Sequence, residues 1–193
     1  TFTSMNWSVP QTVTVSGVDD ALDDGNVVYG VVTGLASSSD LTYDGINPSD
    51  VSLSNTDNDV AGVTVSPTSG LTTTEAGGTA MFTLVLTSQP TADVTIALAS
   101  SNTAEGTVSS MSVLFTSMNW MVAQAITVTG VDDVALDGNV AYSIVNAAAA
   151  SADGSYNGLS VADVGVTNTD NDAITPVQQA YVKASNTAAN DRF

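Results

Sequence analysis

The chain has 193 residues and a formal charge of −18, from twenty acidic and two basic residues, and it contains neither His nor Cys. This composition excludes nucleic acid and anionic membrane surfaces as partners, because both are bound through Lys and Arg. Its 43% of apolar residues suffices for a folded core, and no apolar run approaches the roughly 20 residues of a spanning helix, so membrane insertion is not expected.

The chain opens with a segment that returns later. Residues 1–59 recur without a gap as residues 114–172, with 32 of 59 positions identical. This period is the size of one β-sandwich domain, roughly 100 residues. Residues 60–172 therefore form one complete unit, residues 1–59 are the C-terminal half of an upstream repeat, and residues 173–193 are a tail or linker.

The incomplete first copy has a physical consequence. Half a sandwich cannot bury its own inner face, because the opposing strands are missing. Residues 1–59 are therefore either a fragment of a longer protein or are completed by strands from a neighbouring chain.

Strand signals dominate the complete unit. Alternating apolar and polar residues, separated by segments rich in Gly, Pro, Asn and Asp, predict seven strands, and no segment has the pattern of an amphipathic helix. The predicted strands are 62–65, 79–87, 94–99, 110–116, 125–130, 140–145 and 161–168. The expected fold is all-β, an antiparallel β-sandwich in a tandem repeat whose first copy is incomplete.

Strand parity places most of the acidic residues together. In an antiparallel arrangement, alternate connections lie at the same pole, as does the chain that leaves the last strand. Seven carboxylates are expected at that pole: Glu75, Glu105, Asp132, Asp133, Asp137, Asp170 and Asp172.

Such a cluster needs compensation, because neighbouring carboxylates repel one another. Residues 60–172 contain no Lys or Arg, which leaves an ion, bound protons or separation by solvent. A hard cation that prefers oxygen ligands fits this inventory, and Ca²⁺ tolerates irregular geometry better than Mg²⁺. Zinc and copper are disfavoured because His and Cys are absent. Solvated acidic turns are the alternative explanation.

Spacing adds a second prediction. Asp170 and Asp172 are two residues apart, so in extended chain both side chains point the same way and can bind one ion. Only two residues separate the copy of this pair from the next predicted strand, so an ion there would fix the angle between neighbouring domains. The copies in the first repeat predict a second, half-built site at Asp19, Asp20, Asp57 and Asp59.

Three motifs resemble the Calx-β family, immunoglobulin-like sandwiches that bind Ca²⁺ at one pole. They are Thr-Glu-Ala-Gly-Gly-Thr-Ala at 74–80, Val-Asp-Asp at 131–133 and Asp-Asn-Asp at 170–172. The resemblance covers residues 62–172 and the half-copy before them, and it implies an immunoglobulin-like fold. It implies as ligands Glu75, Asp132, Asp133, Asp170 and Asp172, with Asp137 as a further candidate. The segment 101–106 departs from the family pattern, and its ligand is either Glu105 or absent.

The expected function is a non-enzymatic, calcium-binding structural or adhesion module that stiffens and spaces an extracellular repeat protein, secreted or on a bacterial cell surface. Its expected partners are neighbouring repeats of the same chain and further copies of itself. The alternative is a self-assembling filament subunit whose first domain is completed by a neighbouring copy. A third hypothesis is a carbohydrate-binding module using Trp7 or Trp120, although an aromatic residue at such a position more often covers a core.

The remaining predictions concern enzymatic activity and the C-terminal tail. An enzyme is not expected, because the complete unit lacks the His, Lys and Arg on which most nucleophile–base pairs and anion clamps depend. The tail 180–193 resembles the start of an FG-GAP repeat, the blade unit of integrin-α-like propellers.

Overall fold

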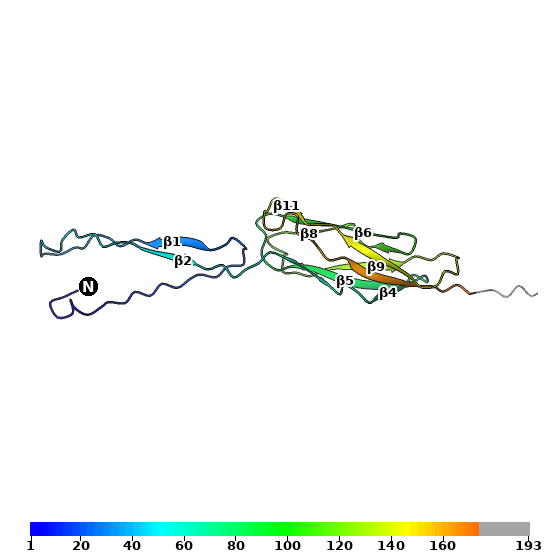
Figure 1. Ribbon diagram of the computed structural model, residues 1–193, viewed down its shortest axis with the longest axis horizontal. Helices are drawn as coiled ribbons and strands as arrows, with labels where there is room; N and C mark the ends of the chain where they lie inside the picture. Colours follow the sequence, from blue (N-terminus) through cyan, green and yellow to red (C-terminus); the bar gives the residue numbers. More distant parts are fainter. Residues whose placement is uncertain (174–193) are drawn as a thin grey trace, which may run out of the picture.

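The computed structural model describes residues 1–173, which contain β-strands and turns but no helix. A two-stranded hairpin precedes a larger sandwich, and the two lie end to end (Figure 1). The described residues therefore include no helix that could span a membrane. The predicted FG-GAP resemblance falls on residues 180–193, outside the described part of the chain.

The sandwich consists of two sheets. One has the order β3-β5-β9-β7 and contains β3 (Val63–Ser66), β5 (Thr79–Leu86), β7 (Gly106–Val108) and β9 (Gln124–Gly130). The other has the order β11-β6-β10-β12-β4, with β8 also paired to β6. Its strands are β4 (Leu71–Thr74), β6 (Val94–Ser100), β8 (Ser112–Phe115), β10 (Val140–Asn146), β11 (Ala150–Ser151) and β12 (Val164–Thr169). All pairings are antiparallel except that of β12 with β4.

All seven predicted strands are present, but two assignments need correction. The connection after β3 was expected to consist of turns, yet it contains β4, because the edge of β12 offers free backbone groups to Leu71–Thr74. The predicted strand at 110–116 corresponds to β8 alone, and it is preceded by the separate strand β7, which pairs with β9 in the other sheet. The chain therefore crosses between sheets at this point.

The core lies between the two sheets. Alternation along β5 and β9 directs one set of side chains inward, and among them Leu84 and Val128 have no exposed surface. Phe115 and Tyr156 are also buried, and Trp120 packs against the edge of the core, which confirms the expectation that it covers the core.

Comparison of residues 1–59 with their copy in the sandwich shows which strands depend on neighbouring strands. Its strands β1 (Val27–Val31) and β2 (Val51–Asn55) are the repeat copies of β10 and β12. Residues 11–17 repeat the sequence of β9, but they form no strand. In the sandwich, β9 lies between β5 and β7, and residues 1–59 contain no copy of either. Within the described residues, this related sequence therefore forms a strand only where its partners are present.

Direct contacts join the hairpin to the sandwich. The Gln89 N–H donates to the Ala21 carbonyl (2.7 Å), and the Ala61 N–H donates to the Asp23 carboxylate (2.9 Å). The Ser155 hydroxyl also donates to the Asp23 carbonyl (3.3 Å). The loop that carries Asp19 and Asp20 in the first copy is thus anchored on the near pole of the next domain.

Candidate metal centre at the acidic pole

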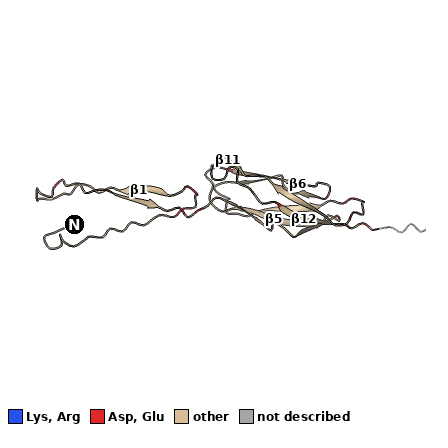
Figure 2. Cartoon of the chain, viewed as in Figure 1, with Lys and Arg blue, Asp and Glu red and all other residues tan. Residues whose placement is uncertain are grey.

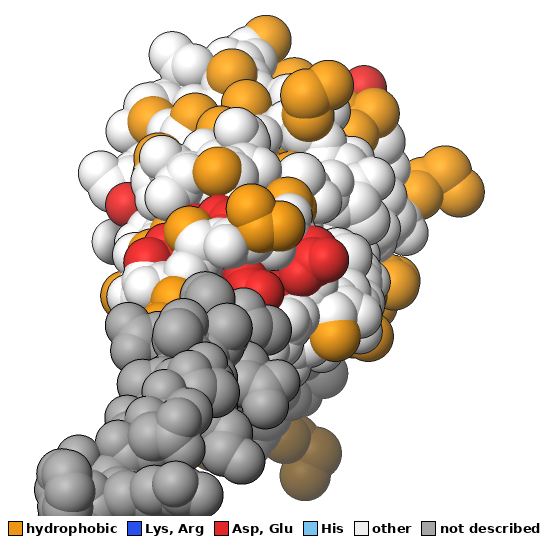
Figure 3. Space-filling model, turned by 90° about the vertical axis from the view of Figure 1, so that its right-hand side faces the viewer, with side chains coloured by type: hydrophobic (Ala, Val, Ile, Leu, Met, Phe, Trp, Pro, Cys, Tyr) orange, Lys and Arg blue, Asp and Glu red, His pale blue; other side chains and the backbone are white. Residues whose placement is uncertain are grey.

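The far pole of the sandwich gathers carboxylates from four places in the chain. They follow the ends of β4, β6, β9 and β12. Figure 2 shows acidic residues at the end of the sandwich remote from the hairpin. Viewed end-on, the surface left visible by the tail shows several acidic side chains together and no basic ones (Figure 3). We call this end of the sandwich the acidic pole.

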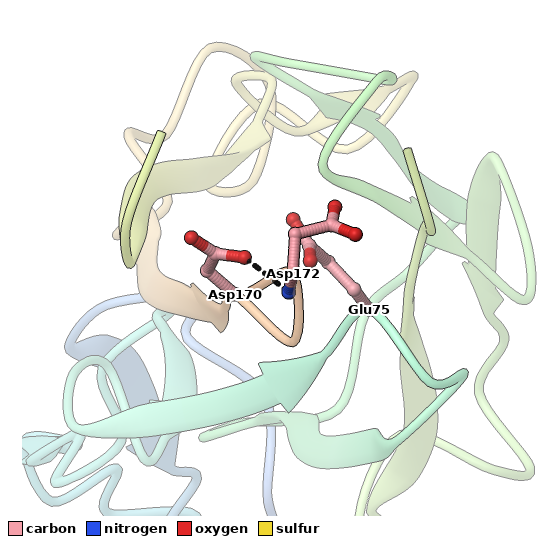
Figure 4. A group of neighbouring side chains, drawn as sticks. All are labelled: Glu75, Asp170 and Asp172. Carbon is pink, nitrogen blue, oxygen red and sulfur yellow. Dashed lines mark hydrogen bonds between the residues drawn. The ribbon is translucent and has the colours of Figure 1, made fainter. Parts of the chain in front are cut away.

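Three of these carboxylates form the first group. Oxygen atoms of Glu75, Asp170 and Asp172 lie within 4.8 Å of one another. Figure 4 shows Glu75 approaching from the end of β4, while Asp170 and Asp172 lie on the chain that leaves β12. The Asp172 N–H donates to Asp170 Oδ1 (2.7 Å), and the Asn171 N–H donates to Glu75 Oε2 (2.9 Å). The parallel pairing of β4 with β12 therefore brings these acids together.

A second group lies beside the first. It contains Glu105, which is buried, and Asp133 and Asp137, which are exposed, again with carboxylate oxygens within 4.8 Å of one another. Asp132 belongs to neither group, but its Oδ1 accepts a hydrogen bond from the Asn171 amide (3.2 Å). All six site residues predicted in the complete unit thus lie at this pole, together with Glu105, whose role the sequence left open.

The electrostatics of the first group are unfavourable. The Asn171 N–H lowers the pKa of Glu75, but burial and repulsion from Asp170, Asp133 and Asp172 together raise that pKa above its ordinary value. Burial raises the pKa of Asp172, and the neighbouring carboxylates, first among them Asp170, raise it further. Both shifts mean that the ionised forms are poorly accommodated without a positive charge.

The donor set fits a hard cation. Glu75 is only 2% exposed, and Asp172 Oδ2 is buried without a hydrogen-bond partner among the described residues. Residues 1–182 contain no Lys, Arg or His, so no side chain of this region can neutralise the group. All available ligand atoms are oxygens, the type that Ca²⁺ and Mg²⁺ prefer.

Asn168 holds the pole together, a role that sequence analysis missed. This buried side chain donates to the Val131 carbonyl (3.0 Å) and to Glu105 Oε2 (3.3 Å), and it accepts from the Thr73 hydroxyl (3.0 Å). Its copy Asn55 makes the first of these bonds, donating to the Val18 carbonyl (2.8 Å). Recurrence of this Asn between the repeats was the available signal.

A glycine is required at position 130, where β9 ends directly before Val-Asp-Asp at 131–133. A Cβ atom added to Gly130 would overlap the backbone carbonyl of Thr74 and the side chain of Asn168. The copy, Gly17, approaches Asn55 just as closely. This close approach explains why Gly precedes Val-Asp-Asp in both repeats.

The half-built site in the first copy reproduces only part of this arrangement. Asp57 accepts from the N–H groups of Asp59 (2.8 Å) and Gly25 (2.6 Å), as Asp170 does from Asp172 and Gly138. Asp19, Asp20, Asp57 and Asp59 line a polar cavity of about 220 Å³. Within residues 1–173, however, none of the four belongs to a group of three close carboxylates. Residues 1–59 contain no copies of Glu75 and Glu105.

The strand order defines the class of the domain. Two facing sheets, antiparallel except for the pairing of β12 with β4, and with the first strand divided into β3 in one sheet and β4 in the other, make an immunoglobulin-like β-sandwich. The hairpin of β1 and β2 precedes it. The sequence matches no protein-family model and no curated protein.

Several solved structures resemble the chain in fold. The apo form of the Calx CBD1 domain superposes with a TM-score of 0.46 and 13% identity, over 59% of this chain and 100% of that one. WR4, an MSP family member of C. elegans, gives a TM-score of 0.36 and 12% identity, over 55% and 95%. The periplasmic chaperone SfaE gives 0.41 and 12%, over 62% and 63%. With all three TM-scores this low, the fold assignment rests on the strand order of the chain itself.

Proposed function

We propose that residues 60–172 bind Ca²⁺ at the acidic pole and serve as a non-enzymatic structural module of an extracellular repeat protein, secreted or on a bacterial cell surface. The observation that carries the proposal is the buried Glu75 carboxylate beside Asp170 and Asp172, in a region without a cationic side chain. The motifs at 74–80, 131–133 and 170–172 support it through their resemblance to Calx-β domains.

The residues have distinct parts in this proposal. Glu75, Asp170 and Asp172 would hold one ion, and Glu105, Asp133 and Asp137 are the candidates for a second. Asp132 would order the intervening loop through Asn171. When bound, Ca²⁺ supplies the positive charge that lets these carboxylates remain ionised close together.

The mechanical consequence follows from where the ligands lie in the fold. The first group connects the end of β4 to the chain that leaves β12, and the second group includes the loop after β9 in the opposite sheet. Ions bound at both groups would therefore engage both sheets and restrain the chain that leaves β12. Neighbouring repeats of the same chain are the proposed partners.

Calorimetric titration of the full chain with Ca²⁺, with Mg²⁺ as the comparison ion, tests the proposal. We expect Ca²⁺ to bind, and Asp172→Asn to weaken binding about tenfold or more, because it removes one charged ligand. Asp93→Asn is the matched control, since Asp93 is exposed and immediately precedes β6, whose first residue lies at the opposite end from the acidic pole.

Two results would contradict the proposal. One is the absence of Ca²⁺ binding up to roughly 10 mM, well above the dissociation constants of weak extracellular modules. The other is an equal loss of affinity in Asp93→Asn and Asp172→Asn, which would indicate diffuse attraction by the net charge of the chain and no defined site.

A further inference from the structure

Strand β8 forms an open lateral edge of the sandwich. It pairs with β6 on one side and with no strand of residues 1–173 on the other. The hairpin and the sandwich lie end to end, and the strands of the sandwich run along the same long axis (Figure 1). A domain placed before or after the sandwich on this axis would therefore leave the edge open. Such an edge offers backbone groups to which another chain can add a strand.

The usual protections of an edge strand are missing from the sequence around β8. Charged residues and Pro commonly prevent strand addition, but residues 106–131 contain neither, although the chain has a charge of −18. Exposed apolar side chains lie in the same segment, among them Met111, Leu114 and Met118. An uncharged, apolar strand of this kind is prone to pair with another copy of itself.

Alternation along β8 identifies the backbone groups that face the open edge. The Leu98 N–H donates to the Met111 carbonyl (2.8 Å), and in an antiparallel pair every second residue makes such bonds. The odd-numbered residues of this segment therefore direct their backbone groups towards β6. The even-numbered Ser112, Leu114 and Thr116 direct theirs towards the open edge.

Side chains of the same segment already bond these outward groups. Asn119 Nδ2 donates to the Leu114 carbonyl (3.2 Å), and Asn119 Oδ1 accepts from the Thr116 N–H (2.6 Å). The Ser110 hydroxyl donates to the Ser112 carbonyl (2.7 Å). Asn119 thus offers β8 one donor and one acceptor, as a neighbouring strand would. We call the side chains of Asn119 and Ser110 the edge cap.

The Asn part of the cap is present in both repeats. Asn6, the copy of Asn119, donates to the Thr1 carbonyl (3.2 Å) and accepts from the Thr3 N–H (2.5 Å). Residues 1–3 form no strand. The network therefore forms from its own local sequence and does not need a sheet beside it.

We propose that the edge cap keeps β8 from pairing with β8 of a second copy of the chain. In the pairing that it prevents, two antiparallel β8 strands meet at a twofold axis, and each Leu114 N–H donates to the Leu114 carbonyl of the other copy. The Thr116 N–H of one copy donates to the Ser112 carbonyl of the other. The Leu114 and Ser112 carbonyls and the Thr116 N–H are the groups that the edge cap bonds in the free chain.

Charge supports a second copy as the chain that the cap excludes. Two chains of charge −18 repel each other, and the repulsion is weakest between surfaces without acidic residues. The acids nearest to β8 in the sequence are Glu105 and Asp132, which both lie at the acidic pole. Antiparallel pairing of two β8 strands places the two acidic poles at opposite ends of the pair. The edge is therefore the side on which two copies approach most easily.

Sedimentation velocity of the unmodified chain and of Asn119→Ala tests the proposal. Metal-free buffer keeps the outcome independent of the proposed Ca²⁺ site. We expect Asn119→Ala to self-associate about tenfold or more tightly, because it frees backbone hydrogen-bonding groups at the edge. Hydrogen exchange locates the contact, since the Leu114 amide of this variant should exchange more slowly as the protein concentration rises.

Three further variants separate edge pairing from other causes. Asn6→Ala removes the same side chain where no strand is present, and it should associate like the unmodified chain. Ser110→Ala frees only the Ser112 carbonyl and leaves the turn at Asn119 intact, so it should raise association by a smaller factor.

The third variant is a rescue. Leu114→Lys in the Asn119→Ala background places a charge on the edge, and it should restore the association of the unmodified chain. Because this Lys lowers the net negative charge, a rescue cannot come from stronger repulsion between whole chains. Partial unfolding caused by Asn119→Ala would not be reversed by a charge at position 114.

Three results would overturn the proposal. The first is equal self-association of Asn119→Ala, Ser110→Ala and the unmodified chain. The second is association of Asn119→Ala that Leu114→Lys does not reverse, since another surface would then be responsible. The third is exchange at the Leu114 amide that does not depend on concentration. Concentration-dependent protection that appears in Asn119→Ala, is absent in Asn6→Ala and is abolished by Leu114→Lys would support it.

Discussion

Replacement of Asn168 by Ala tests how the acidic pole is held together. The change removes hydrogen bonds to the Val131 carbonyl, the Glu105 carboxylate and the Thr73 hydroxyl. Each buried polar group left without a partner costs about 1–3 kcal/mol. The buried Glu105 carboxylate and the Val131 carbonyl lose the Asn168 donor, whereas the buried Thr73 hydroxyl keeps its hydrogen bond to the Tyr142 hydroxyl. We therefore expect Asn168→Ala to lower the free energy of unfolding by roughly 3 kcal/mol, and the melting temperature by about 10 °C.

The first repeat provides the matched control. Asn55→Ala removes the equivalent bond to the Val18 carbonyl, but residues 1–59 contain no copies of Thr73 and Glu105. We expect this variant to change the unfolding free energy of the sandwich by less than about 1 kcal/mol. Urea unfolding of both variants, followed by circular dichroism in metal-free buffer, makes the comparison. Equal destabilisation by the two substitutions would refute the reasoning.

Two further predictions concern the same pole. In metal-free buffer at neutral pH, Asp172→Asn should raise the melting temperature, since the raised pKa of Asp172 means that its ionisation opposes folding. That advantage should shrink as the pH falls through the raised pKa of Asp172 towards the ordinary value of an Asp carboxyl, about 4, and Asp93→Asn should show no comparable trend. A constant difference between pH 4 and 7 would contradict this. Gly130→Ala should destabilise the sandwich strongly in thermal melts, because its Cβ would overlap the backbone of β4, whereas Gly154→Ala has free space and should be tolerated.

Much of the sandwich could be predicted because its signals are local. Alternation identifies strands such as β5 and β9 from their own residues, and antiparallel order then places alternate loops at one pole. The gathering of Glu75, Asp133 and Asp170 at that pole followed from topology alone. These predictions needed no knowledge of side-chain conformations.

The features that were missed depend on neighbours. Leu71–Thr74 forms β4 because β12 offers an edge, whereas residues 11–17 form no strand among residues 1–173, where no strand pairs with them. The carboxylates divide into two groups, and Asp132 belongs to neither. Its Oδ1 instead accepts a hydrogen bond from the side-chain amide of Asn171, a contact that depends on side-chain conformation. Asn168 was overlooked for a related reason, since an Asn at the end of a strand is also an ordinary turn residue.

The junction between the hairpin and the sandwich links the acidic site to domain spacing. In the first copy, the loop after residue 18 carries Asp19 and Asp20, and it also contacts the next domain through Ala21 and Asp23. The next strand begins at Val63, three residues after Val60, so little chain is available to absorb motion at the junction. Any ligand that orders this loop therefore also restrains the contact with the following domain.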